Sequence, residues 1–187
     1  ASRIHKISSE KDSITKFLEK ELKVLEKLGG RIITVWDEDF PLLLKKIYDP
    51  PLVLYVLGQF DEKDKYSIAV VGTRQPTNYG KIQAEKIVTD LVAQNITVVS
   101  GMARGIDSVA HSSALKNNGR TIAVIGSGLD VIYPAENKKL FNEIRDKGVI
   151  ISEFNLGTLP NAENFPKRNR IISGLTLGTL VIETAIT

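Results

Sequence analysis

The sequence predicts an α/β protein with a doubly wound, mainly parallel sheet, and three observations support this fold class. Residues 68–71 (I-A-V-V) are apolar without alternation, which is typical of a strand buried on both faces of a parallel sheet. Comparable runs at 96–99, 122–125, 149–151 and 180–182 are separated by helical or turn-rich segments. Two of the runs, 68–71 and 122–125, are followed directly by glycine. This alternation predicts βαβ units with right-handed crossovers.

Helices are expected after Asn78, Gly105, Glu136 and Phe165. The last apolar run ends only five residues before Thr187, whereas a doubly wound sheet commonly has about six strands. We therefore expect the chain to be truncated at its C-terminal end relative to a longer protein.

Residues 1–30 predict one helix. Ser9 with Asp12 is a loose capping-box candidate, and the glycine pair at 29–30 ends the helix. Its expected apolar stripe consists of Ile14, Phe17, Leu18, Leu25 and Leu28.

The segment after this helix predicts a small α/β extension. Apolar runs at 32–36 and 52–57 are expected to be strands, with a short helix at 42–47 between them. The charged run D-E-K-D-K at 61–65 is most simply a solvated linker into the main domain.

The net charge of +3 lies entirely in the second part of the chain. Residues 1–65 carry equal numbers of acidic and basic side chains, and we take them as the N-terminal extension. Residues 66–187 are expected to form the main, ligand-binding domain. Within it, Lys167, Arg168 and Arg170 gather three positive charges, which favours an anionic ligand there.

Composition excludes several classes of function. The 187 residues include no cysteine, which removes disulfides, thiolate metal sites and Cys nucleophiles. His5 and His111 are the only histidines, so a His-based metal site or triad is disfavoured, and we expect neither a metal nor a cofactor. No apolar run approaches the roughly 18 residues of a membrane span, and no signal peptide is apparent. A cytoplasmic protein is expected.

Three predicted strands are followed by glycine-rich turns: G-T-R at 72–74, S-G-M-A-R-G-I-D at 100–107 and G-S-G-L-D at 126–130. Glycine lets backbone N–H groups approach an anion, and a helix N-terminus adds favourable partial charge. Ligands of open α/β sheets bind at this strand edge. The alternative is that these glycines only permit tight turns. The candidate phosphate-binding residues are Gly72, Thr73, Arg74, Gly101, Ala103, Arg104, Gly105, Ser127 and Gly128.

A second cluster lies in E-N-F-P-K-R-N-R-I-I-S-G-L at 163–175. Lys167 and Arg170, with Asn169 between them, are expected to face a phosphate backbone. Phe165 is either a core residue or a side chain that stacks on a base, as aromatic residues do in single-strand binders.

Helical spacing places Arg168 on the buried face of this segment. We expect it to pair with a strand-end carboxylate such as Glu153 or Glu183, although a contact to an anionic ligand stays open. Those two carboxylates could instead serve as general acid and base, but pairing with arginine explains them more simply. His111 is expected to be a hydrogen-bonded packing residue and Asp107 a helix cap.

No G-x-G-x-x-G fingerprint follows the first buried strand, and no G-x-x-x-x-G-K-[ST] motif occurs. NAD-dependent hydride transfer and P-loop nucleotide hydrolysis therefore lose their best support.

The motifs, taken together, resemble the bacterial DNA-processing protein A family, also called DprA or Smf. They are V-V-G-T-R at 70–74, S-G-M-A-R-G-I-D at 100–107, A-V-I-G-S-G-L-D-V-I-Y-P at 123–134, S-E-F at 152–154 and N-F-P-K-R-N-R-I-I-S-G-L at 164–175. D-F-P-x-L-L and D-P-P-x-V-L-Y upstream extend the match over most of residues 40–185.

The resemblance implies a Rossmann-like domain that binds single-stranded DNA without catalysis. It further implies protection of incoming DNA in natural transformation, loading of the RecA recombinase and, in the full-length protein, a homodimer. It assigns DNA contact to Arg74 and base contact to Phe165. Some members carry a lysine at the position of Ala162, so one phosphate contact is missing here unless Lys167 replaces it. The family's N-terminal helical module is at most partly present.

Two rival functions remain open at this point. One is an enzyme that hydrolyses a nucleoside phosphate, using Glu153 or Glu183. The other is a structural, partner-binding domain whose glycines have no role in ligand binding.

Overall fold

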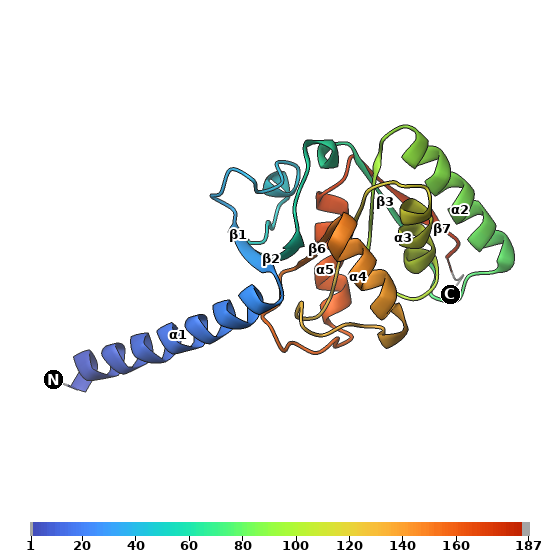
Figure 1. The fold of residues 1–187 in the computed structure, drawn as a ribbon. Coiled ribbons are helices and arrows are strands. Elements are labelled where there is room, and N and C mark those ends of the chain that lie inside the picture. Colours follow the sequence, from blue (N-terminus) through green and yellow to red (C-terminus); the bar gives the residue numbers. More distant parts are fainter. Residues whose placement is uncertain (1, 185–187) are drawn as a thin grey trace.

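The computed structural model describes the backbone of residues 2–184 and the side chains of residues 13–184. Its centre is a seven-stranded sheet in the order β1-β2-β6-β5-β4-β3-β7, flanked by helices on both faces (Figure 1). The fold class predicted from the sequence is confirmed.

Five strands of the sheet are parallel, and they match the five apolar runs of the main domain. They are β3 (Ser67–Gly72), β4 (Thr97–Ser100), β5 (Thr121–Val124), β6 (Val149–Ser152) and β7 (Gly178–Ile182). The connecting helices are α2 (Asn78–Ala93), α3 (Ile106–Lys116), α4 (Lys138–Lys147) and α5 (Asn164–Gly174).

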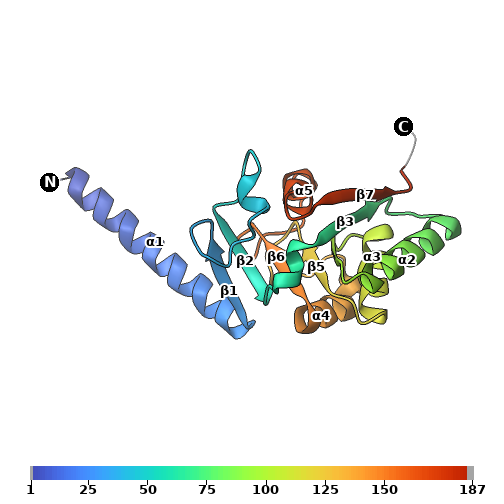
Figure 2. The ribbon, with the colours of Figure 1, turned by 90° about the horizontal axis from the view of Figure 1, so that it is seen from above.

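The direction in which strands are added reverses at β3. Strands β4, β5 and β6 follow β3 toward one side of the sheet, whereas β7 returns to pair with the other edge of β3. Helix α5, which makes this return, lies on the opposite face from α2, α3 and α4 (Figure 2). Such a switch point is where open α/β sheets leave a crevice for a ligand at their carboxyl edge.

The N-terminal extension joins the same sheet. Strand β1 (Gly30–Thr34) pairs antiparallel with β2 (Val53–Gly58), and β2 pairs antiparallel with β6. The short helix expected at 42–47 is a 3-10 turn, η1 (Leu44–Lys46). The division between residues 65 and 66 stays a prediction, but the hydrogen-bonded sheet runs across it.

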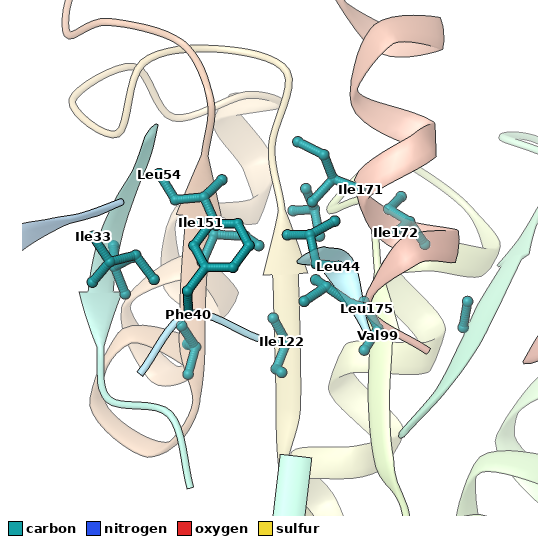
Figure 3. Close-up of a cluster of buried hydrophobic side chains, with 14 of the residues drawn as sticks. Ile33, Phe40, Leu44, Leu54, Val99, Ile122, Ile151, Ile171, Ile172 and Leu175 are labelled. Carbon is teal, nitrogen blue, oxygen red and sulfur yellow. The ribbon is translucent and has the colours of Figure 1, made fainter. Parts of the chain in front are cut away.

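Side chains alternate between two core layers because successive residues of a strand face opposite sides of the sheet. On the α5 face, Leu54, Ile122 and Ile151 pack against Ile171 and Leu175 (Figure 3). On the other face, separate clusters form under α2, α3 and α4. This packing holds α5 on the sheet, with the N-terminal residues of the helix at the carboxyl edge of the strands.

Helix α1 (Ser2–Lys27) projects away from the sheet (Figures 1 and 2). It ends at Lys27, and Gly29 follows with a φ of 72°, which suits a left-handed C-terminal turn and agrees with the predicted glycine stop. The backbone is already helical at Ser9 and Asp12, and their predicted capping contact lies outside the described side chains. Of the apolar stripe, Leu25 is buried and Leu28 is partly buried. Exposed members are Ile14, Phe17 and Leu18.

The prediction of a solvated linker at 61–65 is confirmed for four exposed residues and is wrong for Asp64. The segment forms a 3-10 turn, η2 (Glu62–Lys65), with Asp61 as the N-cap of a capping box. Asp64 is buried and accepts hydrogen bonds from Arg120, at 2.7 Å from Nε, and from the Thr97 hydroxyl at 3.0 Å. A partly buried pair of charges 56 residues apart fixes this segment to the amino edge of the sheet.

Candidate nucleic-acid interface

A cavity of about 720 Å³ opens at the switch point of the sheet. Its walls come from the end of β3, from β7, from α5 and from the second glycine-rich turn with the start of α3. The lining includes eight of the predicted site residues: Gly72, Thr73, Arg74, Ala103, Phe165, Arg168, Asn169 and Arg170. The structure therefore brings the first glycine-rich turn and the cationic cluster of α5 together.

Arg74 is exposed at the mouth of this cavity. Its guanidinium lies 5.0 Å from the ring centroid of Phe165, which is a cation–π contact. Within the described residues, its side chain makes no hydrogen bond and no ion pair. Arg74 is thus held by an aromatic ring while its five N–H donors stay available to an anion.

Arg168 is buried, with only 3% of its surface exposed. Its Nη1 donates to the carbonyl oxygens of Gly101, at 2.6 Å, and of Val124. The pKa of Arg168 is lowered to about 10, mainly by burial. The Asp107 charge acts in the opposite direction, and the Arg74 charge contributes a smaller decrease. The guanidinium stays charged at neutral pH and supports the floor of the cavity.

The predicted partners of Arg168 are wrong, because its buried carboxylate neighbour is Asp107. Burial raises the pKa of Asp107, and the Arg168 charge acts in the opposite direction. Asp107 accepts from the amide of Ala103 at 3.3 Å and does not cap α3 through its side chain, which corrects that prediction too. A Cβ on Gly101 would come within about 2.6 Å of both charged groups, so the close approach requires glycine here.

His111 is a buried packing residue, as predicted. Its Nδ1 lies 2.7 Å from the Thr121 hydroxyl, which itself donates to Val98, so Nδ1 carries the hydrogen. Nε2 has no hydrogen-bond partner. Desolvation, with the Arg168 charge as the second cause, lowers the pKa of His111 to about 3. The ring is neutral beneath the cavity.

Arg170 is paired with carboxylates, whereas the sequence predicts that it faces a phosphate backbone. It forms an ion pair with Glu153, 2.5 Å from Nη2 to Oε1, and a second with Asp49 at 3.0 Å. Sequence analysis assigned Glu153 to Arg168, two residues away on the same helix. Lys167 and Asn169 are exposed and flank these groups. Lys167 is not among the residues that line the cavity, although its helix neighbours Phe165 and Arg168 are.

The second turn packs directly on the first. Gly105 has a φ of 78°, and a Cβ there would collide with the backbone of Thr73 and Arg74. The amide of Ile106 donates to the Thr73 carbonyl at 3.1 Å. Arg104 points to solvent and pairs with Glu136. Gly105 thus acts in loop packing, which is the simpler of the two roles considered for these glycines.

Several loop amides that were candidates for phosphate binding already have acceptors within the protein. The amide of Thr73 donates to Glu183, and that of Gly128 donates to Thr158, both at 2.9 Å. The buried hydroxyl of Ser127 donates to the Val131 carbonyl at 2.8 Å. The third turn is therefore internally satisfied, and we leave Ser127 and Gly128 out of the interface.

Glu153 and Glu183 have structural partners rather than a shared site. Glu153 pairs with Arg170. Glu183 accepts from the amide of Thr77 at 2.9 Å, next to the start of α2. No group of three or more His, Cys, Asp or Glu side chains in the described part of the chain could hold a metal ion. The geometry offers no specific support for hydrolytic chemistry.

Sequence analysis missed Tyr133. Its ring lies 6.0 Å, centroid to centroid, from Phe165 with the planes tilted by 40°, and 38% of the residue is exposed. The motif I-Y-P at 132–134 could have pointed to this residue, because a turn after a buried strand does not require an aromatic side chain.

Among the described residues, no helix is long and apolar enough to cross a membrane.

The chain is similar to known proteins over most of its length. The family model for DNA recombination-mediator protein A matches residues 31–187. Protein Smf of Synechocystis sp. is 44% identical over 184 residues, covering 96% of this chain and 46% of that protein. DNA processing protein DprA of Streptococcus pneumoniae is 43% identical over 150 residues, covering 80% of this chain and 53% of that protein. The chain thus spans about half the length of these two curated relatives.

Solved structures agree with this assignment. The X-ray structure of DNA processing protein A from Streptococcus pneumoniae has a TM-score of 0.80 and 41% identity, covering 83% of this chain and 55% of that one. The protein from Helicobacter pylori, described for its single-stranded DNA binding mode, has a TM-score of 0.74 and 30% identity, covering 84% and 71%. This chain belongs to the DNA recombination-mediator protein A family, whose members are named DprA or Smf.

Proposed function

We propose that this chain binds single-stranded DNA, non-catalytically, at the cavity between β3, β7 and α5. The observation that carries the proposal is Arg74, an exposed guanidinium without an anionic partner in the described structure, stacked on Phe165 at the mouth of the cavity. A cation beside an aromatic ring provides the two contacts that a single strand offers, phosphate and base. The Helicobacter pylori relative, which binds single-stranded DNA, supports the ligand class.

The geometry supports a narrower set of contacts than the sequence predicts. We assign phosphate contacts to Arg74 and to the exposed Lys167, and base contact to Phe165, which lines the cavity. Arg168 acts from below, through its positive charge and its support of the floor. Arg170 is neutralised by Glu153 and contributes less than the sequence predicts. Contacts of this kind carry little sequence information, so the binding is not base-specific.

In the cell, this activity would protect incoming single strands and deliver them to the RecA recombinase during transformation. That role, the homodimer and the cytoplasmic location follow from the family resemblance alone. They concern the whole protein, of which this chain represents about half in its curated relatives.

Arg74→Ala should weaken binding of a labelled single-stranded oligonucleotide about tenfold, because it removes both a charge-assisted contact and the cation held over Phe165. Fluorescence anisotropy at several salt concentrations measures the affinity. With about two or three phosphate contacts, log K against log salt should have a slope of about −1.4 to −2.1 for the unsubstituted chain. The variant should show a slope smaller by about 0.7.

Arg145→Ala is the matched control, because Arg145 is an exposed arginine in the last turn of α4 whose ion-pair partner among the described residues is its neighbour Asp146. It should leave affinity and slope unchanged. Duplex DNA and a mononucleotide should compete poorly. Equal affinity of the unsubstituted chain and Arg74→Ala would reject the assignment, and release of base or phosphate from the mononucleotide would favour an enzyme.

A further inference from the structure

We propose that Tyr133 and Arg104 form a second nucleotide subsite beside the cavity, at which the tyrosine ring stacks on a base and Arg104 binds the phosphate of the same strand. The inference rests on the proposed function and extends the interface by one nucleotide. It adds Tyr133 as a binding residue.

The placement of Tyr133 carries the first part of the argument. One side of its ring packs against Phe165, at 6.0 Å between centroids, while 38% of the residue is exposed to solvent. An aromatic side chain that served the core alone would be covered. The tilt of 40° gives the two rings different orientations, so each can meet a different base of a flexible strand.

Arg104 supplies the charge next to this ring. Its side chain is 58% exposed, and its Nε and Nη2 face the two carboxylate oxygens of Glu136, with 3.2 Å between Nη2 and Oε2. Glu136 raises the pKa of Arg104, and the Tyr133 phenol contributes in the same direction, which places the three groups together. Arg104 differs from Arg170, which pairs with two carboxylates and is only 26% exposed. Arg104 pairs with one carboxylate, and its Nη1 has no partner among the described residues, so a phosphate can bind without breaking the ion pair.

The two side chains are held in fixed relation by Asn137. This buried amide donates to the Met102 carbonyl at 2.9 Å and to the Ser108 hydroxyl at 2.8 Å. It thereby ties the turn that carries Tyr133 to the turn that carries Arg104. The subsite is preorganised, which reduces the entropy lost when a strand binds.

The path of the strand follows from these positions. Phe165 contacts both Arg74 and Tyr133, so the two aromatic rings form one surface next to Arg74. Arg104 lies in the second turn, which packs on the backbone of Arg74. Arg104 comes from the second glycine-rich turn and Tyr133 from the segment after the third. The third turn therefore contributes through the ring of Tyr133 although its Ser127 and Gly128 have internal partners.

Tyr133→Leu should weaken binding to an oligothymidylate about tenfold, because stacking on an aromatic side chain is lost. Its affinity for an abasic oligonucleotide of the same length should equal that of the unsubstituted chain, since no base is present to stack. Tyr66→Leu is the matched control: Tyr66 is also exposed beside a cation, Lys65, but it precedes β3 at the amino edge of the sheet. That variant should bind both oligonucleotides normally.

Arg104→Gln should weaken binding to both oligonucleotides and reduce the salt slope by about 0.7. Equal binding of the oligothymidylate by Tyr133→Leu and the unsubstituted chain would overturn the subsite while leaving the proposed function intact. An equal loss on the oligothymidylate and the abasic strand would assign Tyr133 a merely structural role and overturn it also. No binding by the unsubstituted chain would overturn both proposals.

Discussion

Arg168→Met should lower the free energy of unfolding by about 3–5 kcal/mol, the largest effect we expect from a single substitution near the cavity. The change leaves the carbonyls of Gly101 and Val124 without their donor and leaves Asp107 buried without its counter-charge. A buried carboxylate in that state must either stay charged at high cost or take up a proton. Urea denaturation followed by far-ultraviolet circular dichroism measures the loss.

Lys167→Met is the matched control, because Lys167 neighbours Arg168 on α5 but is exposed. It should change the free energy of unfolding by no more than about 0.5 kcal/mol. The double variant Arg168→Met with Asp107→Leu removes both charges and should recover part of the loss. A cost below about 1 kcal/mol for Arg168→Met would show that the buried cation is dispensable.

The stability of the protein should fall as the pH drops below 6.5, through His111. Its folded pKa of about 3 lies below the ordinary value of 6.5, so the unfolded chain takes up a proton that the folded chain refuses. The stabilisation is complete above pH 6.5 and is lost as the pH falls toward 3. Each pH unit in this window should cost about 1.4 kcal/mol.

The comparison with His111→Asn isolates this effect, because asparagine can keep the hydrogen bond to Thr121 without titrating. Asp107, whose pKa is raised, acts in the opposite direction and is present in both proteins. The variant should therefore gain stability relative to the unsubstituted chain by about 1.4 kcal/mol between pH 7.5 and 5.5. Parallel pH profiles of the two proteins would show that His111 does not control acid unfolding.

The strands and helices of the main domain could be predicted from sequence because their signals are local. Runs such as 68–71 are apolar on both faces, and the helices between them have the matching period. The pairing of β2 with β6 could not be predicted, since the two strands are far apart in sequence and no local pattern selects the partner. The ion pair of Asp64 could not be predicted either, because its partner Arg120 lies 56 residues away in the sequence.

The site was predictable as far as topology determines it. A turn after β3 and the start of α5 meet wherever a sheet reverses its strand order, so Arg74 and the cluster around Arg168 had to come together. Partner choice was not predictable. Helical spacing placed Arg168 on the buried face but could not show whether its carboxylate neighbour is Asp107 or Glu153. For that reason Glu153 was assigned to Arg168, whereas it pairs with Arg170.

The antiparallel pairing of β2 with β6 has a consequence for biosynthesis. During translation, β1 and β2 are synthesised well before β6, so the edge of β2 that pairs with β6 is unpaired in the nascent chain. Translation that stalls before residue 149 leaves that edge open, and open edges are where incomplete chains aggregate.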